Sequence, residues 1–306
     1  MTAKIILVAG AARGLGRMTA QALAQSGHTV YASMGGAGGC SAAQAKQVQA
    51  YARDHGVDLR AIELDPGSDA SVGRAVGTIL NLHGRIDILV HSAGPMAYGP
   101  AEAFTPEQFA ALYGSHVIAA QRINRAVLPP MRRCGRGLLV WISASGVAGG
   151  VPPYLAGYLA AKAGLDALAV QYAGELARWG IETSIVVPGL LFRDPGRFIQ
   201  TEHPADEARA AEYEAGPYRD FARQIEEGVA RRIPSDADPG KVAGAIAGIV
   251  DTPFGERPFR LHVDPGDDGG SVAFPVIDRV RSEMLRRLGF ADLLNPRITG
   301  PEANGK

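Results

Sequence analysis

The 306-residue sequence has little of what would indicate a secreted, metal-binding or nucleic-acid-binding protein. Its only cysteines, Cys40 and Cys134, are too few for a disulfide framework and lack the spacing of a metal site. Its 31 Lys and Arg balance its 31 Asp and Glu, so no net field attracts nucleic acid or an acidic membrane surface. We therefore expect free thiols in a reducing compartment, no metal, and neither nucleic acid nor membrane as a partner.

Long hydrophobic runs are also missing. No apolar segment approaches the length of a membrane span, and the first residues lack the basic and apolar regions of a signal peptide. These absences predict a cytoplasmic protein. A chain of 306 residues with 46% hydrophobic and 20% charged residues suits one large α/β domain.

Glycine, by contrast, is plentiful, and one glycine-rich turn directly follows the first apolar run. Residues 5–9 (IILVA) are typical of a buried parallel strand, residues 10–16 (GAARGLG) form the turn, and residues 17–25 are compatible with a helix. At such a junction the helix amides bind the pyrophosphate of a dinucleotide, and glycines allow its close approach. A tight turn without a ligand is the alternative, because the spacing differs from the commoner G-x-G-x-x-G.

A second pattern joins a tyrosine, a lysine and a serine. Tyr158 and Lys162 are four residues apart in a predicted helix and share one face of it, and Ser145 precedes the tyrosine by thirteen residues. A nearby ammonium lowers the pKa of a phenol, which then suits proton transfer in carbonyl/alcohol interconversion. Ser145, at the end of the preceding strand, could hydrogen-bond the substrate oxygen.

Apolar segments alternate with helical patterns along the chain, which predicts a doubly wound α/β fold with a parallel sheet. The predicted strands are Ile5 to Ala9, His28 to Ser33, Leu59 to Leu64, Ile86 to His91, Leu138 to Ser143, Glu182 to Val187 and Phe259 to Val263. The strongest helical patterns cover Pro106 to Arg133 and Ala156 to Trp179. Ligands of such folds bind outside the carboxyl ends of the strands, where the glycine turn and Ser145 both fall.

Together these motifs resemble the classical short-chain dehydrogenase/reductase family over almost the whole chain. The glycine turn matches the cofactor motif of the family, and Ser145, Tyr158 and Lys162 match its catalytic residues. Pro188-Gly189 matches the Pro-Gly after the sixth strand, whereas Ala9 and Ser92 stand where Thr and Asn are usual. The resemblance implies a single Rossmann-type domain over residues 1–306, a nicotinamide cofactor and a small-molecule substrate.

The resemblance also assigns the cofactor contacts, which are Gly10, Arg13, Gly14, Leu15, Gly16, Ser33, Asp65, Ser92, Ala93, Gly94, Tyr158, Lys162, Pro188 and Gly189. We expect NADP in preference to NAD, because the second strand ends without an acid for the ribose hydroxyls. Arg13 and Ser33 could instead meet a 2′-phosphate, although Arg13 could equally face solvent. Asp65 is implied to contact adenine, and the alternative is a cap on the helix that begins near Ser68.

By the same resemblance, Lys162 holds the nicotinamide ribose and keeps the pKa of Tyr158 low, while Ser145 and Tyr158 polarise the substrate carbonyl. Ser143 competes with Ser145, but the thirteen-residue spacing favours Ser145. His116 aligns with an Asn whose backbone binds a water in the proton relay of the family. It could hold that water or shuttle protons itself, or it could be a packed helix residue with no relay role.

Residues 190–238, rich in Ala, Glu and Arg, are predicted to insert a helical lid over the substrate, and a solvated surface insertion is the alternative. The predicted substrate contacts are Met96, Tyr154, Leu190, Leu191 and Phe192, where Tyr154 either lines the pocket or packs on the loop. Residues 272–288 are predicted to form an amphipathic helix, and residues 272–306 together a C-terminal helix and tail.

The predicted function is an NADPH-dependent carbonyl reductase or alcohol dehydrogenase acting on a small or medium organic carbonyl or alcohol. Two alternatives stay open. One is a cofactor-assisted isomerase or epimerase, in which the hydride leaves and returns, and the other is a non-catalytic dinucleotide-binding regulator. Relatives usually pair their two long helices across two-fold axes, so the resemblance implies a homodimer or homotetramer.

Overall fold

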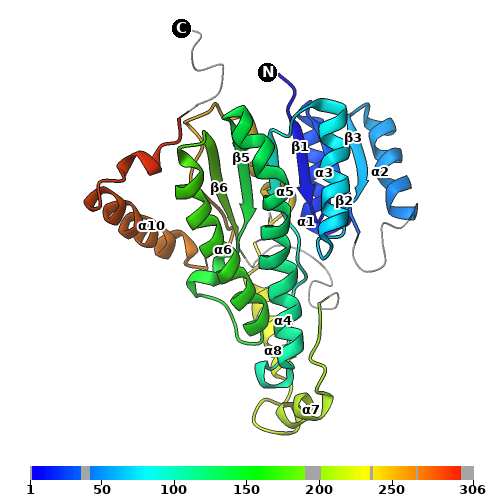
Figure 1. Ribbon diagram of the computed structural model, residues 1–306. Helices are drawn as coiled ribbons and strands as arrows, with labels where there is room; N and C mark the ends of the chain where they lie inside the picture. Colours follow the sequence, from blue (N-terminus) through cyan, green and yellow to red (C-terminus); the bar gives the residue numbers. More distant parts are fainter. Residues whose placement is uncertain (1, 36–41, 190–200, 235–236, 267, 298–306) are drawn as a thin grey trace.

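The computed structural model describes residues 2–35, 42–189, 201–234, 237–266 and 268–297. Within these ranges the chain forms a seven-stranded parallel sheet in the order β3-β2-β1-β4-β5-β6-β7, with helices on both faces (Figure 1). The strands are β1 (Ile5–Ala9), β2 (Thr29–Met34), β3 (Leu59–Glu63), β4 (Ile88–His91), β5 (Gly137–Ile142), β6 (Ile181–Pro188) and β7 (Arg260–Val263). The predicted doubly wound, Rossmann-type single domain is confirmed.

Ten α-helices lie in the described ranges. They are α1 (Gly14–Gln25), α2 (Ala42–His55), α3 (Asp69–His83), α4 (Pro106–Tyr113), α5 (Ala119–Cys134), α6 (Ala156–Ala177), α7 (Glu207–Ala215), α8 (Phe221–Arg232), α9 (Gly240–Asp251) and α10 (Gly270–Arg287). Short 3-10 turns cover Ala101–Ala103, Ser145–Ala148 and Ala291–Leu294. None of the helices within these ranges is both long enough and apolar enough to cross a membrane.

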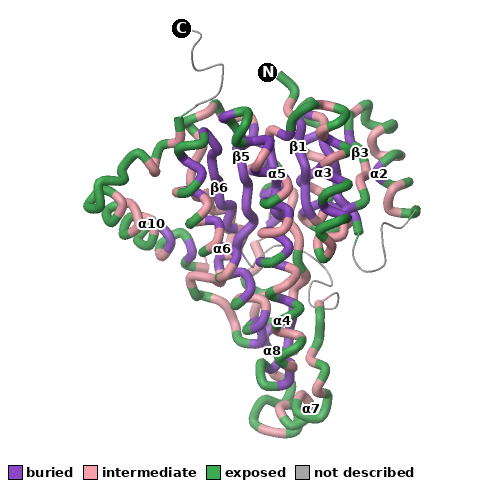
Figure 2. Tube along the Cα trace, viewed as in Figure 1, coloured by how far each residue is buried: buried purple, intermediate pink, exposed green. Residues whose placement is uncertain are grey.

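The central strands β1, β4 and β5 are buried along their whole length (Figure 2). Successive side chains of a strand point to opposite sides, so these strands are covered on both faces. In β1, Ile6 and Val8 pack with residues of α1, α2 and α9. Ile5, Leu7 and Ala9 pack with residues of α3, α5 and α6. This two-sided burial explains why the central strands are nearly continuous apolar runs in the sequence.

The strand order reverses between β1 and β4. From β1 the chain moves outward to β2 and β3, and then returns to β4 on the other side of β1. Ala9 at the end of β1 lies beside His91 at the end of β4. The loops after these two strands therefore leave the sheet in opposite directions and open a crevice, which is where ligands of doubly wound sheets bind.

The segment predicted as one helix from Pro106 to Arg133 has an interruption. Thr105 begins α4 with a reciprocal capping box to Gln108, and a π-helical turn at Gly114–Ile118 separates α4 from α5. A π-turn adds a residue to the helical repeat and thereby re-aims its side chains, and such turns are frequent at functional sites. His116 lies in this turn and is buried.

Beyond the carboxyl ends of the strands, α7 and α8 extend away from the sheet (Figure 1). Phe221 and Ile225 of α8 pack on Tyr98, Tyr154 and Leu155. These two helices lie within the segment predicted to be a lid, and their action as a lid stays a prediction. Leu190, Leu191 and Phe192 fall outside the described residues.

Candidate active site

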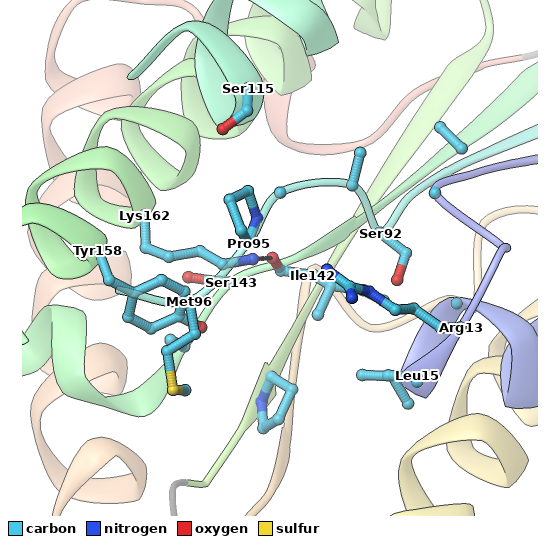
Figure 3. A pocket seen from close by; sticks show the side chains of 18 of the residues that line it. Arg13, Leu15, Ser92, Pro95, Met96, Ser115, Ile142, Ser143, Tyr158 and Lys162 are labelled. Carbon is cyan, nitrogen blue, oxygen red and sulfur yellow. Dashed lines mark hydrogen bonds between the residues drawn. The ribbon is translucent and has the colours of Figure 1, made fainter. Parts of the chain in front are cut away.

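A cavity of about 610 Å³ lies at the carboxyl ends of the strands. Arg13 and Leu15 enter it from the glycine turn, while Tyr158 and Lys162 enter from α6 on the other side (Figure 3). The predicted site residues that line it are Gly10, Arg13, Gly14, Leu15, Gly16, Ser33, Ser92, Ala93, Gly94, Met96, Ser145, Tyr158, Lys162, Pro188 and Gly189. One hollow thus joins the glycine turn to the tyrosine–lysine pair.

The glycine turn is packed so closely that side chains are excluded. Gly10 has a φ of +80°, and a Cβ there would lie 2.6 Å from the Cα of Ala93. A Cβ on Gly16 would overlap the carbonyl oxygen of Gly10. Helix α1 begins at Gly14 without a side-chain cap from Arg13, so its first amides are available to an anion. The turn therefore fits the pyrophosphate of a dinucleotide.

At the opposite side of the turn, Ser33 accepts a hydrogen bond from the backbone N–H of Gly10 at 3.0 Å. Asp65 does not line the cavity. Its carboxylate accepts from the N–H of Gly67 at 2.9 Å and so closes the turn before α3, which Ser68 caps. Asp65 thus closes the turn, whereas the cap of α3 that the alternative assigned to it belongs to Ser68, and the adenine contact stays a prediction.

Lys162 is buried and extends along Tyr158. Its Nζ donates to the carbonyl oxygen of Ile142 at 2.7 Å and lies 5.9 Å from the centroid of the Tyr158 ring (Figure 3). Burial lowers the pKa of Lys162 to about 8. An ammonium held in this low-dielectric position favours the phenolate form of the neighbouring tyrosine.

His116 lies behind Tyr158 rather than on the cavity wall, with the two ring centroids 5.7 Å apart. Its Nε2 is 2.9 Å from the carbonyl oxygen of Pro95, and a carbonyl can only accept, so Nε2 carries the proton and Nδ1 is left as an acceptor. Nδ1 is buried without a hydrogen-bond partner among the described residues. Burial, followed by the charge of Lys162, lowers the pKa of His116 to about 3, so the ring is neutral.

The two serines at the end of β5 have different partners. Ser143 donates to Asp166 at 2.6 Å, and Asp166 in turn binds the buried Arg260 at 2.7 Å. Arg260 also binds Asp278 of α10 at 2.8 Å, so Ser143 belongs to a network that fastens α10 to the body of the protein. Ser145 lines the cavity, and its hydroxyl donates a hydrogen bond to the carboxylate of Asp268.

The sequence reasoning missed Asp268 and also Glu202. Asp268 follows β7 in an acidic, glycine-rich stretch, which was the one available signal. Glu202 lines the cavity, and its backbone N–H donates to the carbonyl oxygen of Met96 at 2.9 Å. Nothing in the local sequence of residue 202 indicates that pairing, which depends on the tertiary fold.

Tyr154, a predicted substrate contact, does not line the cavity. Its ring packs between Tyr98 and Phe221, with centroid separations of 5.8 and 5.3 Å. Its hydroxyl is buried and has no hydrogen-bond partner among the described residues. Tyr154 therefore supports the packing of α8, which agrees with the alternative that it packs on the loop.

Comparison with known proteins agrees with this geometry. The family model of short chain dehydrogenases matches residues 4–194. The chain is 31% identical over 189 residues to 3-ketodihydrosphingosine reductase of Bacteroides thetaiotaomicron, an alignment that covers 62% of this chain and 64% of that protein. It is 31% identical over 204 residues to a 3-oxoacyl-(acyl-carrier-protein) reductase of Salmonella typhimurium, covering 66% and 79%.

A solved structure extends the likeness to nearly the full chain. The crystal structure of a short-chain dehydrogenase from Streptomyces avermitilis has a TM-score of 0.70 at 29% identity, and it covers 94% of this chain and 98% of that one. The match to the Bacteroides reductase spans less than two thirds of that protein, so the likeness there concerns the common domain. The chain belongs to the short-chain dehydrogenase family.

Proposed function

We propose that this protein is a nicotinamide-dependent carbonyl reductase or alcohol dehydrogenase with NADP as its preferred cofactor. The observation that carries the proposal is the Tyr158–Lys162 pair at one end of a cavity whose other end is the glycine turn. The names of the two curated relatives, both reductases of carbonyl compounds, point the same way.

In the proposed reaction, Tyr158 gives its proton to the substrate carbonyl oxygen and takes it back in alcohol oxidation. The nicotinamide, when bound, supplies or accepts the hydride. The ammonium of Lys162 stabilises the phenolate that Tyr158 leaves behind, and its anchor on the Ile142 carbonyl fixes its position. Ser145 supplies a second polar contact to the substrate.

His116 is proposed to hold a water on the proton route to Lys162. Its Nδ1 is a buried acceptor without a partner among the described residues, next to Tyr158. Because its pKa is about 3, His116 does not carry the proton itself near neutral pH. It would act as a fixed acceptor through its ring, whereas the resemblance implies that relatives bind this water with the backbone of an Asn.

The preference for NADP rests on the end of β2. Ser33 and Gly35 line the cavity there without an acid, and Arg13 reaches into it from the turn. A guanidinium and a hydroxyl on the wall of one cavity suit a 2′-phosphate, whereas ribose hydroxyls are usually bound by a carboxylate. The other implied cofactor contacts, including Asp65 toward adenine, remain part of the proposal.

The test is consumption of NADPH and NADH with a panel of ketones, aldehydes and alcohols. Tyr158→Phe should lose at least about a hundredfold in rate while cofactor binding is retained, because it removes general-acid catalysis alone. Tyr154→Phe is the matched control, since Tyr154 does not line the cavity, and it should stay active.

The alternatives predict different results. Substrate turnover without a net change in cofactor absorbance would indicate an isomerase or epimerase. Cofactor binding without conversion of any compound would indicate a non-catalytic regulator. Either result would overturn the proposed reductase activity.

We also propose self-association as a homodimer or homotetramer. An exposed apolar stripe runs along α10 at Val272, Val276, Val280 and Met284 and continues to Leu288 just after the helix. Val272 is 72% exposed. Tyr113 and Ile118 are exposed beside the long helices. Light scattering after size-exclusion chromatography tests this, and a monomer at all concentrations would contradict it. The cytoplasmic location stays a prediction.

A further inference from the structure

Ser145 and Asp268 form a side-chain pair that no motif indicates. Ser145 is 2% exposed, and its Oγ donates to Oδ2 of Asp268, 123 residues further along the chain. Ser145 nevertheless lines the cavity beside Tyr158. The carboxylate of Asp268 thus accepts a hydrogen bond from a residue on the cavity wall.

The loop that carries Asp268 is built to hold it there. The carboxylate of Asp264 accepts from the backbone N–H groups of Gly266, at 3.1 Å, and of Asp268, at 2.7 Å. The N–H of Gly270, the first residue of α10, lies 3.4 Å from Oδ1 of Asp268. A carboxylate just before an 18-residue helix is also favoured by the helix dipole.

Two glycines allow the loop to approach. A Cβ on Gly150 would overlap the carbonyl oxygen of Asp268, and a Cβ on Gly270 would lie 3.2 Å from the Cβ of Ser145. Gly150 has a φ of +78°, which other residues rarely adopt. The absence of side chains at Gly150 and Gly270 therefore lets Asp268 come within hydrogen-bonding distance of Ser145.

This pairing decides which hydrogen bonds Ser145 can make in the cavity. A serine has one proton, and an ionised carboxylate can only accept. Because the hydroxyl of Ser145 already donates its hydrogen bond to Asp268, Ser145 can only accept a hydrogen bond from a group in the cavity. Ser143 and Ser115 are similarly committed, since they donate to Asp166 and to the carbonyl oxygen of Leu112.

We propose that Asp268 is a specificity-determining residue that makes Ser145 a hydrogen-bond acceptor, so that the site selects substrates with a hydroxyl beside the reacting carbonyl. The proposal rests on the proposed function, in which Tyr158 protonates the carbonyl oxygen. A hydroxyl on the substrate carbon next to the carbonyl donates the hydrogen bond that the oxygen of Ser145 can accept. A plain ketone leaves that buried acceptor unpaired, which disfavours its binding.

The test compares two ketones of equal heavy-atom count, 1-hydroxy-2-butanone and 3-pentanone, which differ only in that the hydroxyl of the first is a methyl in the second. For the wild type, kcat/KM should be at least about tenfold higher for the hydroxy ketone. Asp268→Ala should bring this ratio close to one, mainly by raising the rate with 3-pentanone, because the hydroxyl of Ser145 can then donate its hydrogen bond to the substrate carbonyl. Glu175→Gln, which removes an exposed acid of α6 outside the cavity wall, should leave the ratio unchanged.

Ser145→Ala separates this role from a structural one. If Asp268 acts through Ser145, Asp268→Ala should change nothing further in a Ser145→Ala background. Asp268→Asn, which removes the charge at nearly constant volume, serves if the alanine variant fails to fold. A wild-type ratio near one, or equal losses for both ketones with a lowered Tm in the Asp268 variants, would overturn the proposal.

A binding measurement tests the specificity role of Asp268 independently of whether the protein reduces ketones. Calorimetry on the Tyr158→Phe enzyme loaded with NADPH gives the Kd of each ketone without turnover. Tighter binding of the hydroxy ketone, lost in the Tyr158→Phe, Asp268→Asn double variant, supports the specificity role even if no ketone is reduced. Equal affinities for the two ketones would contradict it.

Discussion

Lys162 donates a hydrogen bond from Nζ to the carbonyl oxygen of Ile142, which ends β5, at 2.7 Å. This single bond ties α6 to the end of a central strand. It places the ammonium, which is buried, 5.9 Å from the ring centroid of Tyr158. The lysine is therefore positioned by the backbone of the sheet, and its charge acts on the phenol from a fixed direction.

The titration of Lys162 should appear in the pH profile. Burial lowers its pKa to about 8, so the side chain is charged below that pH and neutral above it. Activity should then fall as pH rises through about 8, because the neutral amine no longer stabilises the phenolate. Measurement of kcat from pH 6 to 10 checks this expectation.

Lys162→Arg is the matched variant for that profile. A guanidinium stays charged over the whole range, so the variant should lack the decline near pH 8, although its rate is lower because its geometry differs. An unchanged decline in the arginine variant would assign the titration to another group, such as Tyr158 itself.

Gly16 should be intolerant of any side chain. A Cβ there would overlap the carbonyl oxygen of Gly10, so Gly16→Ala must displace the turn whose amides face the cofactor. The loss of one charge-assisted hydrogen bond weakens NADPH binding by about tenfold or more. Fluorescence titration measures this Kd.

Gly73→Ala provides the control for Gly16→Ala. Gly73 lies inside α3, where an added Cβ meets nothing within 4 Å. Alanine should therefore leave cofactor affinity unchanged and raise the stability slightly, since glycine is unfavourable in a helix interior. Equal affinities in the two variants would contradict the role assigned to the turn.

The parts of this protein that sequence predicts well are those whose cause is local. Each predicted strand corresponds to an observed one within about two residues, because short apolar segments between turn residues mark the strands. The signal is strongest for the central strands, which are buried along their whole length. The glycine turn and the tyrosine–lysine pair are equally local. The i and i+4 spacing on α6 brings Tyr158 and Lys162 to one face without help from the rest of the fold.

The parts that were missed depend on distant residues. The Ser145–Asp268 pair spans 123 residues, and the contact of Arg260 with Asp166 spans 94. The π-turn that interrupts the helix around His116 leaves no periodic signal, since the apolar pattern continues through it. Tyr154 packs away from the cavity because α8 supplies Phe221, a contact set by the tertiary arrangement.

Arg13 should distinguish the two nicotinamide cofactors. If its guanidinium binds the 2′-phosphate, Arg13→Ala should weaken NADPH by about tenfold or more, the contribution of a charged hydrogen bond. The affinity for NADH, which lacks that phosphate, should change little. Arg17→Ala is the control, because Arg17 is an exposed arginine in the first turns of α1, which Arg13 precedes, and is not part of this cavity wall. Equal losses for both cofactors would place Arg13 on the shared pyrophosphate instead.

His116 should support catalysis as an acceptor and not as a titrating base. His116→Phe removes Nδ1 and the bond to Pro95 while keeping a flat ring against Gly94, so kcat should fall by about tenfold or more with little change in cofactor Kd. His116→Asn restores an acceptor and should recover most of the rate. Since the pKa of His116 is about 3, neither variant should move the pH profile between 5 and 9. A His116→Asn enzyme as slow as His116→Phe would show that the ring acts by packing on Tyr158 and Gly94, and that the relay follows another path.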